Sequence, residues 1–154
     1  MIKLSVAQLE HEVVHLKGEE PATILELGDN SFYEAIAPLR YDLTAKMVSG
    51  GVLVSGLIET VIAGECGRCL VPVESKIVND DVCLFFENVE SPELDITEDV
   101  REEMLVELPM NLLCSEDCAG LCPKCGANLN FEECHCAEAA SGNMAWDALD
   151  SLKF

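Results

Sequence analysis

The sequence predicts an α+β fold: a curved antiparallel β-sheet, or an open barrel, flanked by short helices and followed by a cysteine-rich, zinc-binding tail. Three observations carry this prediction. Residues 41–86 either alternate apolar and polar side chains or run apolar, as β-strands do. Helical periodicity is confined to short segments on either side. Six of the nine cysteines fall within residues 114–136.

Apolar residues recur at helical spacing near the N-terminus and predict a short helix, namely Val6, Leu9, Val13 and Leu16. Ser5 and Gln8 have the spacing of a capping box, and Gly18 is a plausible stop for the helix. The run Thr23–Leu27 then reads as a short strand before a turn-forming sequence.

Strands are predicted next over residues 41–48, 52–63 and 71–86. Gly50 and Gly51 between the first two indicate a hairpin turn. Gly56 within the long second strand indicates a bulge or bend. Asn79-Asp80-Asp81 interrupts the third run, so this run is either two strands or one continued strand. Together these strands predict an antiparallel sheet.

An acidic segment follows, with nine acids and one base between Glu87 and Glu107. Thr97 is expected to cap a helix here, because acids occupy the first turn, where the helix dipole favours them. Val100, Met104 and Leu108 would form its apolar stripe, and Pro109 would end it. The acidic segment has two readings that stay open: a contact surface for a basic partner, or a solvated helix face with a flexible loop.

The chain is expected to divide into an α+β domain over residues 1–110 and a cysteine-rich tail over 111–154 packed back on the sheet. The tail from Cys114 to Cys136 is too poor in β-branched residues to build a core of its own, so it needs another source of stability. After Gly142, three apolar residues predict a short closing helix, namely Trp146, Leu149 and Leu152.

Two cysteine pairs have the C-x-x-C spacing that lets two thiolates in one tight turn meet a tetrahedral zinc ion. They are Cys66-Gly-Arg-Cys69 and Cys122-Pro-Lys-Cys125-Gly. The second has the proline and glycine of a zinc knuckle. Eight cysteines form four close pairs, which suits two structural Cys₄ sites. The preferred grouping is Cys122, Cys125, Cys134 and Cys136 in one site, and Cys66, Cys69, Cys114 and Cys118 in the other.

Several alternatives remain beside this grouping. One zinc ion could instead be held by Cys66, Cys69, Cys122 and Cys125, and His135 could replace a cysteine ligand. Cys83 lies in an apolar run and is expected to be an ordinary buried thiol. A disulfide framework or a redox C-x-x-C at Cys66 and Cys69 ranks below structural zinc. No catalytic zinc pattern, phosphate-binding loop, dinucleotide-binding turn or nucleophile elbow is present, so no enzymatic activity is expected.

An ordered set of motifs resembles the bacterial YceD family. The motifs are Cys66-Gly-Arg-Cys69-Leu70-Val-Pro72, Leu105-Val-Glu-Leu-Pro109, Leu113-Cys114, Cys118-Ala-Gly120-Leu121-Cys122-Pro-Lys-Cys125-Gly-Ala-Asn128-Leu129-Asn130 and Cys134-His-Cys136. This resemblance implies a role in the accumulation of large-subunit (23S) ribosomal RNA. Some family members lack the tail cysteines, which implies that zinc supports the fold and performs no chemistry.

The formal net charge of −20 bears on the partner. Two Cys₄ zinc sites would each add −2, giving about −24. Direct grip on a phosphate backbone is therefore disfavoured, although Arg68 and Lys124 could form a small basic spot beside the metals. A basic ribosomal or RNA-processing protein is the expected partner, and no small-molecule substrate is expected. No stretch resembles a signal peptide, and none approaches the roughly 18–20 apolar residues of a membrane span, so a cytoplasmic location is expected.

Overall fold

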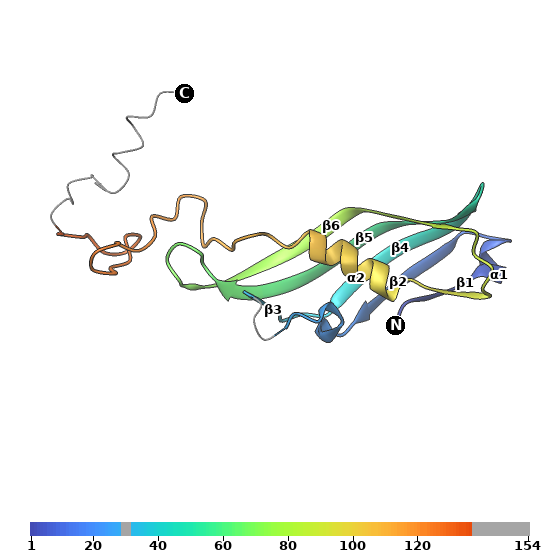
Figure 1. Ribbon diagram of the computed structural model, residues 1–154, viewed down its shortest axis with the longest axis horizontal. Helices are drawn as coiled ribbons and strands as arrows, with labels where there is room; N and C mark the ends of the chain where they lie inside the picture. The colour runs from blue at the N-terminus through green and yellow to red at the C-terminus, as the bar shows by residue number, and fades with distance from the viewer. Residues whose placement is uncertain (29–31, 137–154) are drawn as a thin grey trace, which may run out of the picture.

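The computed structural model describes residues 1–28 and 32–136, and these are mostly antiparallel β-structure with few helices (Figure 1). The elements, in chain order, are β1 (Lys3–Ser5), α1 (Val6–Leu9), β2 (Val14–Glu20), the 3₁₀ helix η1 (Ala22–Leu25), β3 (Tyr33–Ala35), β4 (Leu39–Val48), β5 (Gly51–Glu65), β6 (Pro72–Glu87), β7 (Glu93–Asp95) and α2 (Thr97–Val106). The predicted closing helix at Trp146, Leu149 and Leu152 lies outside the described residues.

The main sheet has five strands, and β5 is its centre. β6 pairs with β5 along its full length, so β4 and β3 share the other edge of β5, and β2 pairs with β4. All these pairings are antiparallel. No pairing joins β2 to β6 within residues 1–28 and 32–136, so this sheet does not close into a barrel. The predicted antiparallel sheet is thus confirmed.

The hydrophobic core lies between one face of the sheet and a layer made by α2, α1 and the small β1–β7 ribbon. The helix α2 lies along this face in Figure 1. The predicted apolar stripe is correct for Val100 and Met104, which are fully buried in the core cluster, whereas Leu108 lies beyond the helix and is half-buried against that cluster. Among the helices of the described ranges, none has both the length and the apolarity needed to cross a membrane.

The N-terminal helix prediction is wrong beyond Leu9. Residues Val14–Glu20 form β2 instead, in register with β4 from Ala45 to Leu39. The side chains of Val14 and Leu16 are half-buried while His15 and Lys17 point outward, a period of two that suits the free edge of β4. The strand predicted at Thr23–Leu27 is also wrong, because residues 22–25 form η1 directly after Pro21, whose ring fixes φ at −59°.

The predicted hairpin at Gly50-Gly51 is confirmed, with Gly50 at a φ of 97°. Gly56 marks a register shift between β5 and β6, as predicted, and β6 absorbs the extra residue at Asp80-Asp81 without breaking. Cys83 was expected to be buried, but it is exposed. The register places Val82 toward the core, so Cys83 must point to the opposite face of the sheet.

Thr97 does not cap α2 with its side chain, because the N-cap residue is Ile96 and Thr97 begins the helix. Its hydroxyl oxygen instead accepts a hydrogen bond from the backbone N–H of Ile2 at 2.8 Å and binds the Asp95 carboxylate. This contact joins the N-terminus to the start of α2. The helix ends at Val106, three residues before Pro109.

Candidate metal centre

The loop between the two longest strands carries the first cysteine pair. Cys66 directly follows β5, and its backbone N–H donates to the carbonyl of Val71 at 2.8 Å. The N–H of Leu70 returns to the carbonyl of Cys66 at 2.9 Å, with Leu70 at a φ of 61°. These bonds close a tight loop that directs both thiols of the C-x-x-C motif to one side. The sheet itself therefore positions half of a metal site.

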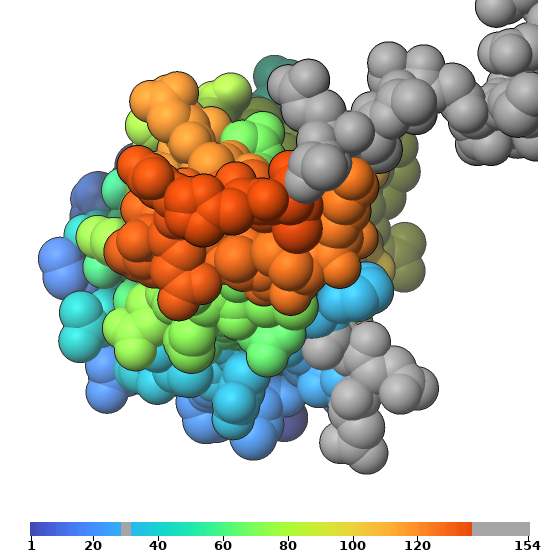
Figure 2. Space-filling view, turned by 90° about the vertical axis from the view of Figure 1, so that its left-hand side faces the viewer, coloured from blue at the N-terminus to red at the C-terminus, as the bar shows by residue number. Residues whose placement is uncertain are grey.

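The chain after α2 brings the other half to this loop. The hydroxyl of Tyr33 donates to the carbonyl of Pro109, and the N–H of Gly67 donates to the carbonyl of Leu112 at 2.8 Å. Cys114 and Cys118 thereby meet the hairpin. Figure 2 shows the result: the orange-to-red chain after α2 lies over the green hairpin loop at one end of the molecule.

The four sulfurs of this first cluster lie within 4.8 Å of one another. Cys66 and Cys118 have their Sγ atoms 3.8 Å apart, and the Sγ atoms of Cys69 and Cys114 are 3.6 Å apart. Cys66, Cys69 and Cys118 are buried, whereas Cys114 is exposed. The cluster thus joins the sheet to the chain that follows α2.

The second cluster is built from the tail alone, by Cys122, Cys125, Cys134 and Cys136. The N–H of Cys122 donates to the carbonyl of Ala127 at 2.8 Å, and the N–H of Gly126 returns to Cys122 at 2.9 Å. Gly126 has a φ of 76°, a backbone conformation that favours glycine. The Sγ atom of Cys134 lies 3.7 Å from that of Cys125 and 3.2 Å from that of Cys122.

Three of the four sulfur–sulfur distances, 3.6 to 3.8 Å, fit zinc, and the Cys122–Cys134 distance is shorter, at 3.2 Å. A tetrahedral ion with Zn–S bonds of about 2.3 Å separates its sulfurs by about 3.8 Å, whereas a disulfide would need about 2.0 Å. Backbone amides also point at the sulfurs: Lys124 N–H at Cys122, and Cys136 N–H at Cys134, both at 3.4 Å. Each cluster could therefore hold one metal ion with four cysteine ligands.

The eight cysteines form the two groups preferred from the sequence. Cys66 and Cys69 lie in one group and Cys122 and Cys125 in the other, so the single-zinc alternative joins cysteines that the structure separates. His135 belongs to neither group, and its imidazole is exposed. That these groups bind zinc stays a prediction.

The thiols within each cluster differ in proton affinity. Burial is the largest influence on Cys66 and raises its pKa, but hydrogen bonds from the backbone amides of Arg68 and Cys114 help to outweigh it and lower the pKa to about 6. Hydrogen bonds with Cys118 and Cys69 raise the pKa of Cys114 to about 12. A metal ion bound by all four sulfurs would therefore have to displace the proton of Cys114.

The second cluster follows the same rule. Backbone amides of Cys125 and Lys124 lower the pKa of the Cys122 thiol to about 6. Hydrogen bonds with Cys134 and Cys125 raise the pKa of Cys136 to about 12. A metal ion bound by all four sulfurs of this cluster would therefore have to displace the proton of Cys136.

Arg68 has a structural role that the spacing of the motif did not reveal. Its Nη1 atom donates to the backbone carbonyls of Glu116 at 3.1 Å and Cys118 at 3.0 Å. The guanidinium thus fastens the tail to the hairpin loop instead of facing a phosphate. The small basic spot that the sequence suggested at Arg68 and Lys124 therefore loses one of its two members to the fold.

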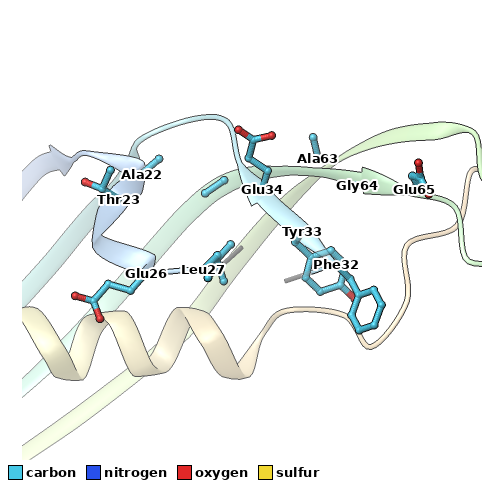
Figure 3. A pocket seen from close by; sticks show the side chains of 12 residues that line it. Ala22, Thr23, Glu26, Leu27, Phe32, Tyr33, Glu34, Ala63, Gly64 and Glu65 are labelled. Atoms are coloured by element: carbon cyan, nitrogen blue, oxygen red, sulfur yellow. The ribbon is translucent and has the colours of Figure 1, made fainter. Parts of the chain in front are cut away.

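A pocket of about 850 Å³ lies between η1 and β3, near the same end of the sheet (Figure 3). Phe32 and Tyr33 present their rings on one side, and Glu26, Glu34 and Glu65 add three carboxylates. Among the described residues that line it, none is a cysteine, histidine, lysine or arginine. The charged side chains among these described lining residues are therefore all acidic.

The fold and the site together define an antiparallel-sheet protein with two four-cysteine clusters at one end. Residues 79–153 match the family described as "Large ribosomal RNA subunit accumulation protein YceD". The resemblance to the YceD family is thereby confirmed, and the chain carries a YceD region over just under half of its length.

Relatives of known sequence agree with this match. A protein of Mycobacterium tuberculosis, named as uncharacterized, is 35% identical over 114 residues, 64% of this chain and 55% of that protein. A chloroplastic YCED homolog 1 of Arabidopsis thaliana, named as a large ribosomal RNA subunit accumulation protein, is 40% identical over 47 residues, 30% of this chain and 15% of that protein. The chain thus spans about half of its mycobacterial relative. No solved structure matches.

Proposed function

We propose that this protein is a non-catalytic, cytoplasmic factor that supports the accumulation or processing of 23S ribosomal RNA by binding a basic protein partner. The observation that carries the proposal is the YceD match over residues 79–153, because the family and its plant relatives are named for ribosomal RNA accumulation. In this proposal each cysteine cluster holds one structural zinc ion, and neither ion takes part in a reaction.

The surface charge favours a protein over RNA as the direct partner. Of the eight Lys and Arg residues in the described ranges, five form ion pairs with acids, namely Lys3, Lys17, Arg40, Lys76 and Arg101. Arg68 is committed to backbone carbonyls. Few cations are therefore available to phosphates, on a chain with a net charge of −20.

The pocket beside β3 is the surface we assign to the partner. Phe32 is 84% exposed at its mouth, and Met110, in the chain that Tyr33 anchors, is 92% exposed. Exposed apolar side chains next to the carboxylates of Glu34 and Glu65 suit a segment that combines apolar anchors with Lys or Arg. The acidic helix α2 offers a further negative surface nearby, with Glu98 and Glu102 exposed.

The cellular role is tested by deleting the gene in its bacterial host and measuring the ratio of 23S to 16S ribosomal RNA. We expect the ratio to fall, and expression of the intact chain to restore it. Restoration by a variant lacking all eight clustered cysteines would contradict the structural role of zinc. An unchanged ratio after deletion would refute the ribosomal role.

The partner surface is tested with the double variant Glu34→Gln/Glu65→Gln. Its control is Glu10→Gln/Glu12→Gln, which removes the same charge from exposed positions after α1. With purified large-subunit ribosomal proteins as probes, we expect the first variant alone to weaken binding. Equal weakening by both variants would mean that net charge, and not this pocket, attracts the partner. Tighter binding to 23S ribosomal RNA than to any protein would favour the direct RNA-binding alternative.

A further inference from the structure

Asn130 belongs to the second module, which is the segment 122–136 that carries the second cluster, but its side chain contacts a thiol of the first cluster. Its Nδ2 donates to the Sγ atom of Cys118 at 3.4 Å, across twelve residues of chain. Its Oδ1 accepts from the backbone N–H of Ala119 at 2.8 Å, and its Nδ2 also donates to Oδ1 of Asn128 at 2.8 Å. These partners leave the amide group one orientation, with its donor side toward the sulfur.

The position of Asn130 depends on the fold of the second module. This module has little apolar packing of its own: Leu129 is 37% exposed and Phe131 is 80% exposed. Its backbone is held by turn hydrogen bonds, such as Phe131 N–H to the Asn128 carbonyl at 3.0 Å, and by the four clustered cysteines. A segment of this kind needs a metal ion to stay ordered, so metal loss there would release Asn130.

The Cys118 sulfur that Asn130 contacts is buried, so a hydrogen-bond donor from the protein has a large effect on its charge. Cys118 is 4% exposed, and its neighbours in the first cluster, Cys66 and Cys69, are 0% and 4% exposed. Negative charge on buried sulfur needs hydrogen-bond donors, because water cannot supply them. Donors to metal-bound ligands commonly change metal affinity by about 10–100-fold.

We infer that Asn130 couples the two metal sites, so that zinc in the second cluster strengthens zinc binding at the first. This inference rests on the proposed zinc sites. Asn130 acts here as a positioning residue, since it contacts a ligand sulfur and not the metal. Thermodynamic linkage makes the effect reciprocal: zinc in the first cluster must favour zinc in the second by the same factor. Two backbone hydrogen bonds also connect the segments around the two clusters. Leu121 N–H donates to the Arg68 carbonyl at 3.1 Å, and Leu129 N–H donates to the Gly120 carbonyl at 2.9 Å.

The test uses the full chain loaded with zinc and titrated with a chelator. Cysteine alkylation, read peptide by peptide with mass spectrometry, reports each cluster separately through Cys66 and Cys122. The variant Asn130→Asp keeps the acceptor for Ala119 but replaces the donor with a carboxylate. We expect the first cluster to lose zinc at about 10–100-fold lower free chelator than in the unmodified chain. The matched control is Phe131→Ala, an exposed neighbour, which should leave both clusters unchanged.

Two further variants separate coupling from misfolding. Asn130→Ser retains a shorter donor and should fall between the unmodified chain and Asn130→Asp. Cys122→Ser/Cys125→Ser empties the second cluster and should weaken the first by a similar factor. Unchanged protection of Cys66 in Asn130→Asp, with both ions bound, would overturn the coupling and leave the zinc sites standing. Absence of protection at both clusters in the unmodified chain would overturn the zinc sites as well.

Discussion

Replacing one exposed thiol in each cluster should separate their contributions to the stability of the sheet. Cys114 and Cys125 are both exposed, so serine at either position removes little packing. Cys69 and Cys114 are 45 residues apart, whereas Cys125 and Cys134 are 9 apart. Treating each zinc ion as a cross-link, the chain-entropy relation gives about 4 kcal/mol for the first loop and about 2.5 kcal/mol for the second. Only the first loop includes a strand of the five-stranded sheet, β6.

We therefore expect Cys114→Ser to lower the free energy of unfolding of the sheet by about 4 kcal/mol, or the melting temperature by about 10 °C. Cys125→Ser should leave the melting of the sheet nearly unchanged. Circular dichroism in the β-sheet region follows the transition with free zinc in excess, so that the remaining cluster stays loaded even when its affinity is about 10–100-fold lower. Elemental analysis should find one zinc per chain in each variant. Equal destabilisation by the two variants would refute the idea that the first cluster, and not the second, cross-links the sheet.

Three further predictions concern pH and packing. In the Cys122→Ser/Cys125→Ser chain, which keeps only the first cluster, zinc affinity should fall more steeply with decreasing pH below about 6. Below that pH Cys66, whose pKa is lowered to about 6, is protonated in the zinc-free chain, so zinc binding must release one more proton. Calorimetry in buffers of different ionisation enthalpy counts the protons released. Met104→Ala should cost about 2–5 kcal/mol in urea unfolding, because Met104 is fully buried in the core. Gly56→Ala should destabilise by about 1–3 kcal/mol or more, because its Cβ would lie 2.2 Å from the Asp42 carbonyl oxygen in the neighbouring strand; a stable variant would mean that the bulge can shift.

Much of the sheet and the pairing of neighbouring cysteines followed from local pattern. The strands 52–63 and 71–86 have the right composition, and Gly50 and Gly56 mark features that depend only on nearby backbone. Sequence spacing also placed the four close cysteine pairs, because each pair fits one turn or short loop. These features share one property: the residues that determine them are near in the chain.

The errors arose where distant residues decide. Val14 and Leu16 fit both helical and strand periods, and the free edge of β4 selects the strand. Cys83 lies in a run of apolar residues that hides the period of two, so its exposed side could not be seen in the sequence. Asn130 and Arg68 stood within recognised motifs, but their contacts cross 12 and 50 residues and left no signal in the spacing.

The two clusters differ in what must exist before each can form. The first needs the β5–β6 hairpin, which already orients Cys66 and Cys69, and the chain after α2, which the Tyr33–Pro109 contact directs toward it. The second is built only from residues 122–136. Its Asn130 side chain bonds to Cys118 and Ala119, beside the first cluster. The YceD match begins at residue 79, within β6, so it contains Cys114 and Cys118 but excludes the hairpin pair. The β5–β6 pairing already joins the matched region to the strands before it, and the first cluster adds a second connection, between the hairpin loop and the chain after α2.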